Sequence, residues 1–215
     1  MKLTLLGHSV LLIETNQIKA IIDPFLQVSS AYKNNPSMLD KLTHIFITHA
    51  HGDHIGSAVE LALKYDALII TNAEIASTLY YQDNRLKLHP MHIGGRFKFD
   101  FGTVKMTPAL HGSGYTVDGK IYDGGNPGGF VIKTEGKTVY HAGDTGLTYD
   151  MKLLAMELID VAFLPIGGNY TMDIDDAVIA TSFIKPKSVI PMHYNTFDMI
   201  KADPNEFKEK VKDCK

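Results

Sequence analysis

One short stretch concentrates most of the metal-binding chemistry of this sequence: Thr48-His49-Ala50-His51-Gly52-Asp53-His54. Residues two apart in an extended segment point to the same side, so His49 and His51 can reach one ion. Gly52 permits a sharp turn that directs Asp53 and His54 toward a second position. Neutral imidazole and carboxylate groups are ligands for zinc, and are also accepted by manganese or iron. The stretch therefore predicts part of a two-metal site.

Further ligands must come from other parts of the chain, because a catalytic ion typically keeps three protein ligands and one open position. The candidates are polar residues that follow later strand-like segments, namely His111, Asp144 and His193. A carboxylate often accepts the second N–H of a ligating histidine, and Asp23 is a candidate for that role.

The remaining histidines divide into two groups. His8 follows a strand-like segment, and we expect it to face the substrate or to support a ligand. His141 is either a support of the same kind or a satisfied core histidine. We interpret the other three as structural or exposed, namely His44, His89 and His92.

The elements that must position these residues alternate between strands and helices. Apolar runs bounded by turns predict strands at 2–6, 10–14, 18–22, 44–48, 67–71, 96–101, 103–108, 129–134, 137–141, 161–165 and 188–191. Helical spacing predicts helices at 56–64, 150–158 and 175–183, one capped by Asn72, and a charged helix from Asp203. The glycine-rich segment 112–128 is expected to be a mobile loop over the site, with Asn126 as a candidate substrate contact.

The two halves of the chain share one pattern. In each, a strand leads to a histidine (His8; His111), and a following hairpin ends at an aspartate (Asp23; Asp144). This predicts a single domain, 1–215, made of two similar halves at about 1–86 and 87–215. The expected fold class is α/β (α+β), a four-layer αββα sandwich in which two sheets pack face to face with helices outside.

Composition excludes several classes of protein. The 21 basic and 24 acidic residues give a net charge of −3 and are interspersed, so neither nucleic acid nor a membrane surface is an expected partner. The lone cysteine, Cys214, allows no disulfide within the chain. The N-terminus turns polar too early for a signal peptide, which favours a cytoplasmic location. Assembly into a homo-oligomer stays open.

The motif His49-x-His51-x-Asp53-His54 resembles the signature of the metallo-β-lactamase superfamily. The resemblance covers essentially the whole chain and implies the metallo-β-lactamase fold. It implies that His111 completes the first metal site, that Asp144 bridges the two ions and that His193 completes the second. It also implies that Asp53 orients the nucleophile besides binding metal.

Four further segments are similar to one branch of that superfamily: Gly7-His8-Ser9, Asn126-Pro127-x-Gly129-Phe130, the run His141-Ala142-Gly143-Asp144-Thr145-Gly146, and Pro165-Ile166-Gly167-Gly168. This branch contains metal-dependent hydrolases related to L-ascorbate-6-phosphate lactonase and to a phospholipase D that acts on N-acylethanolamine lipids. The resemblance implies two divalent ions per chain, with zinc as the first choice and manganese or iron as alternatives.

The expected activity is hydrolysis of a small ester-like substrate, such as a lactone or phosphodiester. Two cations about 3.5–4 Å apart would hold a water whose pKa falls toward ~7, which gives hydroxide at neutral pH. No Gly-x-Ser-x-Gly nucleophile motif occurs in the sequence. Two alternatives remain at this stage: a phosphodiesterase or nuclease of the same fold, and a di-iron redox or metal-sensing protein.

Overall fold

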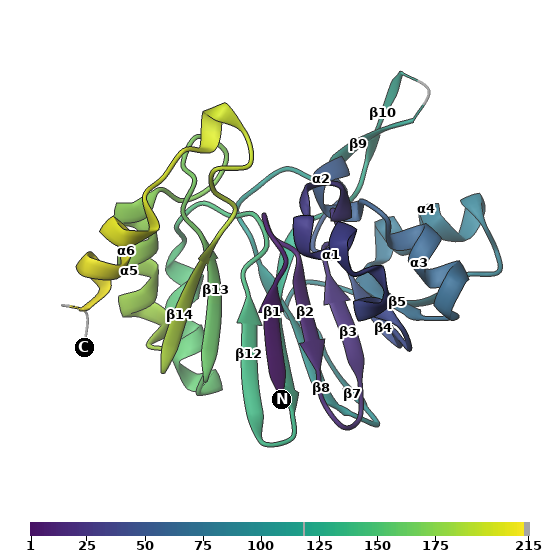
Figure 1. Cartoon of the computed structure of the whole chain (residues 1–215), viewed down its shortest axis with the longest axis horizontal. Helices are drawn as coiled ribbons and strands as arrows, with labels where there is room; N and C mark the ends of the chain where they lie inside the picture. The colour runs from purple at the N-terminus through teal and green to yellow at the C-terminus, as the bar shows by residue number, and fades with distance from the viewer. Residues whose placement is uncertain (118, 213–215) are drawn as a thin grey trace. The chain divides into compact units, whose positions relative to one another are not determined.

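The structure is a computed structural model that describes residues 1–117 and 119–212. Its residues form two compact units, each built around one six-stranded sheet (Figure 1). The first unit contains Met1–Ile93 and Gly112–Pro127, and the second contains 94–111 and the described residues from Gly128 onward. Segment 112–127 therefore leaves the second unit and returns to the first.

The sheet of the first unit has its strands in sequence order. They are β1 (Lys2–Leu5), β2 (Leu11–Glu14), β3 (Lys19–Ile22), β4 (His44–Phe46), β5 (Leu68–Asn72) and β6 (Lys87–Met91). The pairs β1–β2 and β2–β3 are antiparallel, and the pairs from β3 to β6 are parallel. Strands β1, β3 and β4 consequently run in one direction, so the loops after them emerge at the same edge of the sheet.

The helical segments of the first unit are η1 (Leu26–Val28), α1 (Ser30–Asn34), η2 (Pro36–Leu39), α2 (Gly52–Ile55), α3 (Ala58–Tyr65) and α4 (Ala73–Gln82). Helix α3 buries Ala58, Leu61 and Ala62, the apolar positions that predicted it. The side chain of Asn72 accepts a hydrogen bond from the backbone N–H of Ile75, which confirms its predicted role as the N-cap of α4. Helices α3 and α4 lie beside strands β4 and β5 (Figure 1).

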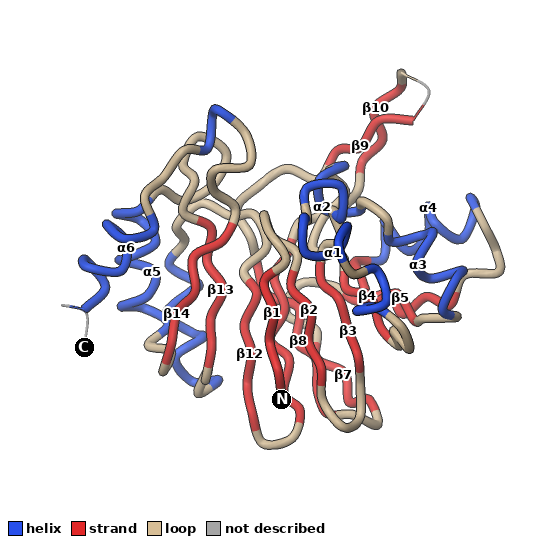
Figure 2. Tube along the Cα trace, in the orientation of Figure 1, coloured by secondary structure: helices blue, strands red, loops and turns tan. Residues whose placement is uncertain are grey.

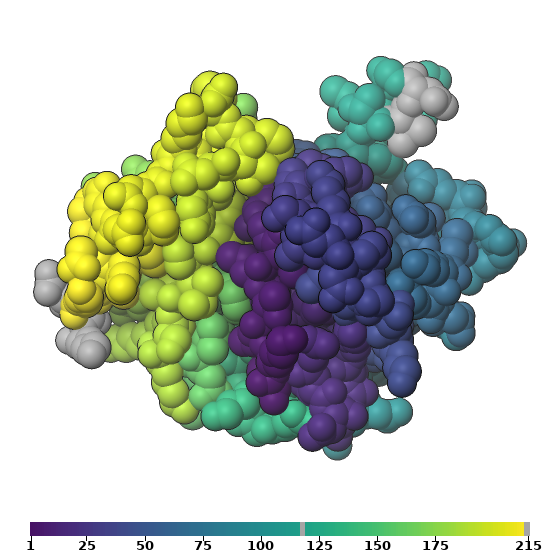
Figure 3. Space-filling view, viewed as in Figure 1, coloured from purple at the N-terminus to yellow at the C-terminus, as the bar shows by residue number. Residues whose placement is uncertain are grey.

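Much of the segment 112–128, where the sequence predicted a loop, forms a β-hairpin. It consists of β9 (Gly114–Val117) and β10 (Lys120–Asp123), which pair antiparallel with Tyr115 opposite Tyr122. The two tyrosine rings stack with their centroids 5.6 Å apart. The hairpin projects from the first unit as the teal arm in Figure 3. The prediction of a loop was wrong here because the Tyr-Thr-Val and Lys-Ile-Tyr runs between the glycines favour strands.

The sheet of the second unit has the order β14-β13-β12-β11-β8-β7. Its strands are β7 (Arg96–Phe99), β8 (Gly102–Pro108), β11 (Gly128–Thr134), β12 (Lys137–His141), β13 (Val161–Pro165) and β14 (Ser188–Met192). Its helical segments are η3 (Tyr149–Glu157), α5 (Ile174–Ile184), η4 (Asp198–Ile200) and α6 (Pro204–Val211). The predicted helix at 150–158 is a 3-10 helix, and α5 and α6 pack side by side (Figure 1).

Five strands of each sheet follow the same pairing sequence. From β8 through β11, β12, β13 and β14, two antiparallel pairs precede two parallel pairs, as they do from β1 to β5. Strands β8, β12 and β14 therefore run in one direction, and the loops after them share one edge of their sheet. In Figure 2 the red strands β12, β13 and β14 lead into tan loops at their carboxyl ends. The single-domain organisation over 1–215 stays a prediction.

Strand β6, which contains Pro90, was not predicted; it lies at the edge of its sheet, where a proline is tolerated. Cys214 lies outside the described residues. Among the described helices, none has the length and apolar character needed to cross a membrane.

Candidate metal centre

The histidine-rich motif of the first unit follows strand β4, bends at residues 49–51 and then turns into α2. His51 is the N-cap of α2, and its own φ of −63° and ψ of 148° are extended, although the backbone bends at 49–51 where the sequence predicted an extended segment. Asp53 and His54 lie within the single turn of α2. His49 and His54 are fully buried, whereas His51 and Asp53 are partly exposed.

The carboxylate of Asp23 organises this motif from the neighbouring strand end. It accepts hydrogen bonds from the backbone N–H of Thr48 at 2.8 Å and from the Thr48 hydroxyl at 2.7 Å. It also lies 2.8 Å from Nδ1 of His54. Asp23 is fully buried, and its predicted role as the partner of a histidine in the motif is confirmed.

This network fixes the tautomers of two histidines. The only proton of the Thr48 hydroxyl goes to Asp23, so the contact of 3.0 Å between Thr48 Oγ1 and His49 Nδ1 requires His49 to donate from Nδ1. His54 donates from Nδ1 to Asp23 directly. In their neutral forms both rings therefore carry the lone pair on Nε2, which is the form that ligates a metal.

The ring nitrogens and the carboxylate of the first unit lie at the separations that a metal site needs. Nε2 of His49 lies 2.9 Å from Nδ1 of His51. Donor atoms on one tetrahedral ion lie roughly 3.3 Å apart, given bond lengths of about 2.0–2.1 Å. One donor atom from each of His8, Asp53 and His54 also lies within 4.8 Å of the other two. The chemistry and spacing of these donors fit a divalent metal ion.

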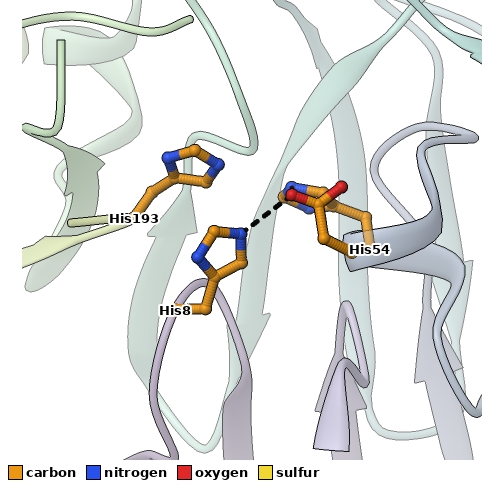
Figure 4. A group of neighbouring side chains, drawn as sticks. His8, His54 and His193 are labelled. Carbon is orange, nitrogen blue, oxygen red and sulfur yellow. Dashed lines mark hydrogen bonds and ion pairs between the residues drawn. The ribbon is translucent and has the colours of Figure 1, made fainter. Parts of the chain in front are cut away.

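His8 contacts Asp53 from the loop after β1. Its Nε2 lies 3.1 Å from Oδ2 of Asp53, a contact drawn in Figure 4, where His8 and His54 are labelled. The backbone of His8 has φ 52° and that of Asp23 has φ 47°, both in the left-handed region that non-glycine residues seldom adopt. Backbone strain of this kind concentrates at functional sites, and two such residues flank this motif.

The second unit collects the other three predicted ligands around one carboxylate. Oδ2 of Asp144 lies 2.9 Å from Nε2 of His193 and 3.6 Å from Nε2 of His111. These residues follow β14, β12 and β8, whose carboxyl ends share an edge of the sheet. All three are largely buried, so the trio is a second set of candidate metal ligands.

Neighbouring groups hold this trio in place. The Thr145 hydroxyl accepts a hydrogen bond from the backbone N–H of Leu110 at 2.9 Å, and the Leu110 carbonyl accepts from the N–H of Gly146 at 3.0 Å. The residue before His111 is thus fixed to the segment that follows Asp144. A Cβ at Gly167 would lie 2.3 Å from the carbonyl oxygen of His193, so this close approach requires glycine.

His141 and Asn126 each make a hydrogen bond to a residue that is not a predicted metal ligand. Nδ1 of His141 accepts a hydrogen bond from the N–H of Gly143 at 3.2 Å, one residue before Asp144. Asn126 is exposed, and its backbone carbonyl accepts from the Asn72 side chain at 3.1 Å. Burial lowers the pKa of both His44 and His89, and neither belongs to the ligand sets above.

Sequence reasoning missed three hydroxyl residues that support the site: Thr48, Ser113 and Thr145. The Ser113 hydroxyl accepts from the N–H of Ala50 at 3.1 Å and donates to the Gly124 carbonyl at 3.0 Å. The signal for Thr48 was its position directly before His49. Ser113 and Thr145 carried no comparable signal because their partners are distant in the sequence.

Comparisons with known proteins identify the class. A family model described as "Beta-lactamase superfamily domain" matches residues 19–194. A UPF0173 metal-dependent hydrolase from Alkaliphilus metalliredigens is 58% identical over 212 residues, covering 99% of this chain and 93% of that protein. Another from Carboxydothermus hydrogenoformans is 47% identical over 213 residues, covering 98% and 92%.

Among solved structures, Igni18, a metallo hydrolase from the hyperthermophilic archaeon Ignicoccus hospitalis, is 41% identical with a TM-score of 0.86. The match covers 98% of this chain and 90% of that one. The α/β class and the metallo-β-lactamase fold predicted from the sequence are confirmed. The chain belongs to the UPF0173 metal-dependent hydrolases of the beta-lactamase superfamily.

Proposed function

We propose that this chain uses a pair of divalent cations to hydrolyse a small ester-like substrate, such as a lactone or phosphodiester. The observation that carries the proposal is the Asp23 network, which fixes His49 and His54 as tautomers with the lone pair on Nε2. A buried carboxylate that orients two histidines in this way is typical of the surroundings of a metal site.

The proposed ligands come from both units: His49, His51, Asp53, His54, His111, Asp144 and His193. Two ions that each keep an open position need about three protein ligands apiece, so the four in the first unit are too few. His111, Asp144 and His193 would supply the rest. We propose zinc as the metal, with manganese or iron as alternatives that the same ligands accept.

When bound, such a pair of cations would lower the pKa of a water toward neutrality and polarise the substrate oxygen. The protein supplies orientation. His8 donates from Nε2 to the Asp53 carboxylate and so fixes the rotamer of that side chain. Asp53 is the proposed catalytic residue, since its carboxylate can accept a proton from the attacking water. His8 is proposed to position Asp53 and to face the substrate.

The test combines metal analysis with a substrate panel. We expect purified protein to contain about two equivalents of metal by mass spectrometry and to hydrolyse lactones or phosphoesters. His51→Ala and Asp144→Ala should each lose metal and lower activity at least about 100-fold while the circular dichroism spectrum is retained. His92→Ala, a change at an exposed histidine outside both ligand sets, is the matched control and should keep metal and activity.

Full turnover by metal-free Asp144→Ala protein would contradict the mechanism. Cleavage of bis(p-nitrophenyl) phosphate without cleavage of any lactone or ester would assign a phosphodiesterase instead. Tightly bound iron together with oxygen consumption would assign the di-iron alternative. A small-molecule substrate and a cytoplasmic location accompany the proposal as predictions from the sequence.

A further inference from the structure

A cavity of about 490 Å³ lies within the first unit, next to the metal-binding motif. Helices α2, α3 and α4 contribute Ile55, Val59, Ile75 and Leu79 to its lining, and the hairpin contributes Tyr115. His51 lines the same cavity. Its volume lies within the range of about 300–1,000 Å³ that is usual for pockets holding small molecules.

The lining of this cavity carries no formal charge. It includes no aspartate, glutamate, lysine or arginine, and its polar groups besides His51 are the side chains of Thr78, Gln82 and Thr116 and the hydroxyl of Tyr115. Away from His51, a phosphate or carboxylate buried here would have no cationic side chain of the lining to offset the loss of its hydration, which is expensive. The lining therefore matches an uncharged, apolar group of a ligand.

Hydrogen bonds fix the hairpin wall of the cavity to the metal-binding motif. The backbone N–H of Ala50, which lies between His49 and His51, donates to the Ser113 hydroxyl. The Asn72 side chain donates to the Gly124 carbonyl at 2.6 Å, and Asn72 also caps α4. A Cβ at Gly124 would lie 2.4 Å from that of Ala50, so the two ends of the hairpin close tightly over the motif.

We propose that this cavity binds the apolar acyl group of a carboxylic ester, with the scissile bond placed beside His51. The inference rests on the proposed hydrolase activity and narrows its substrate to one class, the carboxylic esters. Water adds to the carbonyl carbon, the bond from that carbon to the leaving oxygen breaks, and the products are a carboxylic acid and an alcohol. The acyl chain lies against Ile75 and Leu79 of α4 on one side and against Tyr115 on the other.

A binding experiment tests the cavity apart from catalysis. Octan-2-one carries an apolar chain and a carbonyl but no bond that can be hydrolysed, and its binding is followed by isothermal titration calorimetry. We expect saturable binding with a negative heat-capacity change, the mark of apolar burial. Thr78→Phe, which fills the cavity, should weaken the affinity at least about 10-fold.

Ser77→Phe is the matched control, because Ser77 is an exposed neighbour on α4 outside the cavity lining. It should leave the affinity for octan-2-one unchanged. Tyr115→Ala, which removes the opposite wall without touching α4, is a second variant in case Thr78→Phe perturbs folding. It should also weaken binding, and thermal unfolding checks that both variants are folded.

A kinetic series tests the assignment to an ester. For p-nitrophenyl esters from acetate to octanoate, kcat/KM should rise by up to about 4-fold for each methylene that the cavity buries. Thr78→Phe should lower the octanoate-to-acetate ratio at least about 10-fold, and Ser77→Phe should not change it.

The possible results separate this inference from the proposed function. Ester hydrolysis without dependence on chain length, and without octan-2-one binding, would overturn the assignment of the cavity while the hydrolase stands. Octan-2-one binding that Thr78→Phe abolishes, without hydrolysis of any ester, would overturn the proposed ester substrate.

Discussion

The carboxylate of Asp23 sets the tautomers of two histidines through two different hydrogen-bond paths. One route is direct, through Nδ1 of His54, and the other passes through the Thr48 hydroxyl to Nδ1 of His49. Because the carboxylate is fully buried, water does not compete for these hydrogen bonds. The metal-binding form of both rings is therefore set before an ion arrives.

Asp23→Asn is predicted to weaken metal binding about 10–100-fold. The amide keeps the shape of the side chain but replaces one acceptor oxygen with an NH₂ group. An NH₂ group accepts no hydrogen bond, so in the place of Oδ2 it loses the bonds from both the Thr48 hydroxyl and His54, and in the place of Oδ1 it opposes the N–H of Thr48. Either orientation weakens the network that holds the two histidines in their metal-binding tautomers. Competition with a chromogenic chelator measures the affinity.

Asp40→Asn provides the control for that change. Asp40 is an exposed acceptor of the Tyr65 hydroxyl and lies outside the ligand sets. Its replacement should leave the metal affinity at the value of the unaltered protein. Equal affinity in the Asp23→Asn and Asp40→Asn proteins would show that the Asp23 network does not support the metal.

The sequence predicted those residues whose side-chain type alone indicates metal binding. Alternate spacing and chain order were enough to nominate the histidines and aspartates, and the hydrogen bond to His54 confirms the expectation for Asp23. Thr48 and Ser113 could not be nominated in this way. A hydroxyl acquires its role only from partners that lie 25 and 63 positions away in the chain.

Elements with a regular apolar period were predicted well, and irregular ones were not. Helices α3 and α5 and the strands of both sheets except β6 lie close to their expected positions. Strand β6 was missed because Pro90 counts against a strand, yet the edge position removes that objection. The single turn of α2 is too short to give a periodic signal.

The turn of α2 is held against the end of β3 by a close approach that only glycine permits. Gly56 ends α2 with φ 44°, and a Cβ there would lie 2.4 Å from the Pro24 carbonyl oxygen. Gly56→Ala is predicted to lower the free energy of unfolding by at least about 2 kcal/mol, because left-handed strain and a clash combine. Urea unfolding followed by circular dichroism measures the change.

Gly136→Ala separates the cost of backbone strain from the cost of the clash. Gly136 has φ 70° in the turn between β11 and β12, and a Cβ there would meet nothing within 4 Å. Its replacement should cost about 1 kcal/mol from backbone strain alone. Equal losses at Gly56 and Gly136 would show that the contact with Pro24 contributes nothing.

Glu157, a carboxylate of the second unit, links the stability of the protein to pH. Burial alone would raise the pKa of Glu157, but hydrogen bonds from Arg96, Lys133 and Lys105 outweigh it and hold the pKa at about 2. These cations come from β7, β11 and β8, and they meet Glu157 at the end of η3 at 2.6, 2.9 and 3.0 Å. The contacts join that helix to three strands.

Glu157→Gln is predicted to lower the free energy of unfolding by about 1–2 kcal/mol at neutral pH. The folded pKa of Glu157 lies below its ordinary value of 4.5, so its contribution is fully present above pH 4.5 and is lost as the pH falls toward 2. Urea unfolding of the unaltered protein and of Glu157→Gln across pH 2–7 should give free energies of unfolding that converge as the pH falls. A difference that stays constant over that range would contradict this role of Glu157.

The path of the chain through the two units has a consequence for how the protein is made. The chain passes from one unit to the other after Ile93, after His111 and after Pro127. Strands β8 and β11 are neighbours in one sheet, yet the hairpin that separates them in sequence belongs to the other unit. A ribosome therefore delivers β7 and β8 before the first unit has received its last segment. A fragment cut at Ile93 would lack Ser113 and Tyr115, so neither unit can be produced whole as one uninterrupted piece of the gene product.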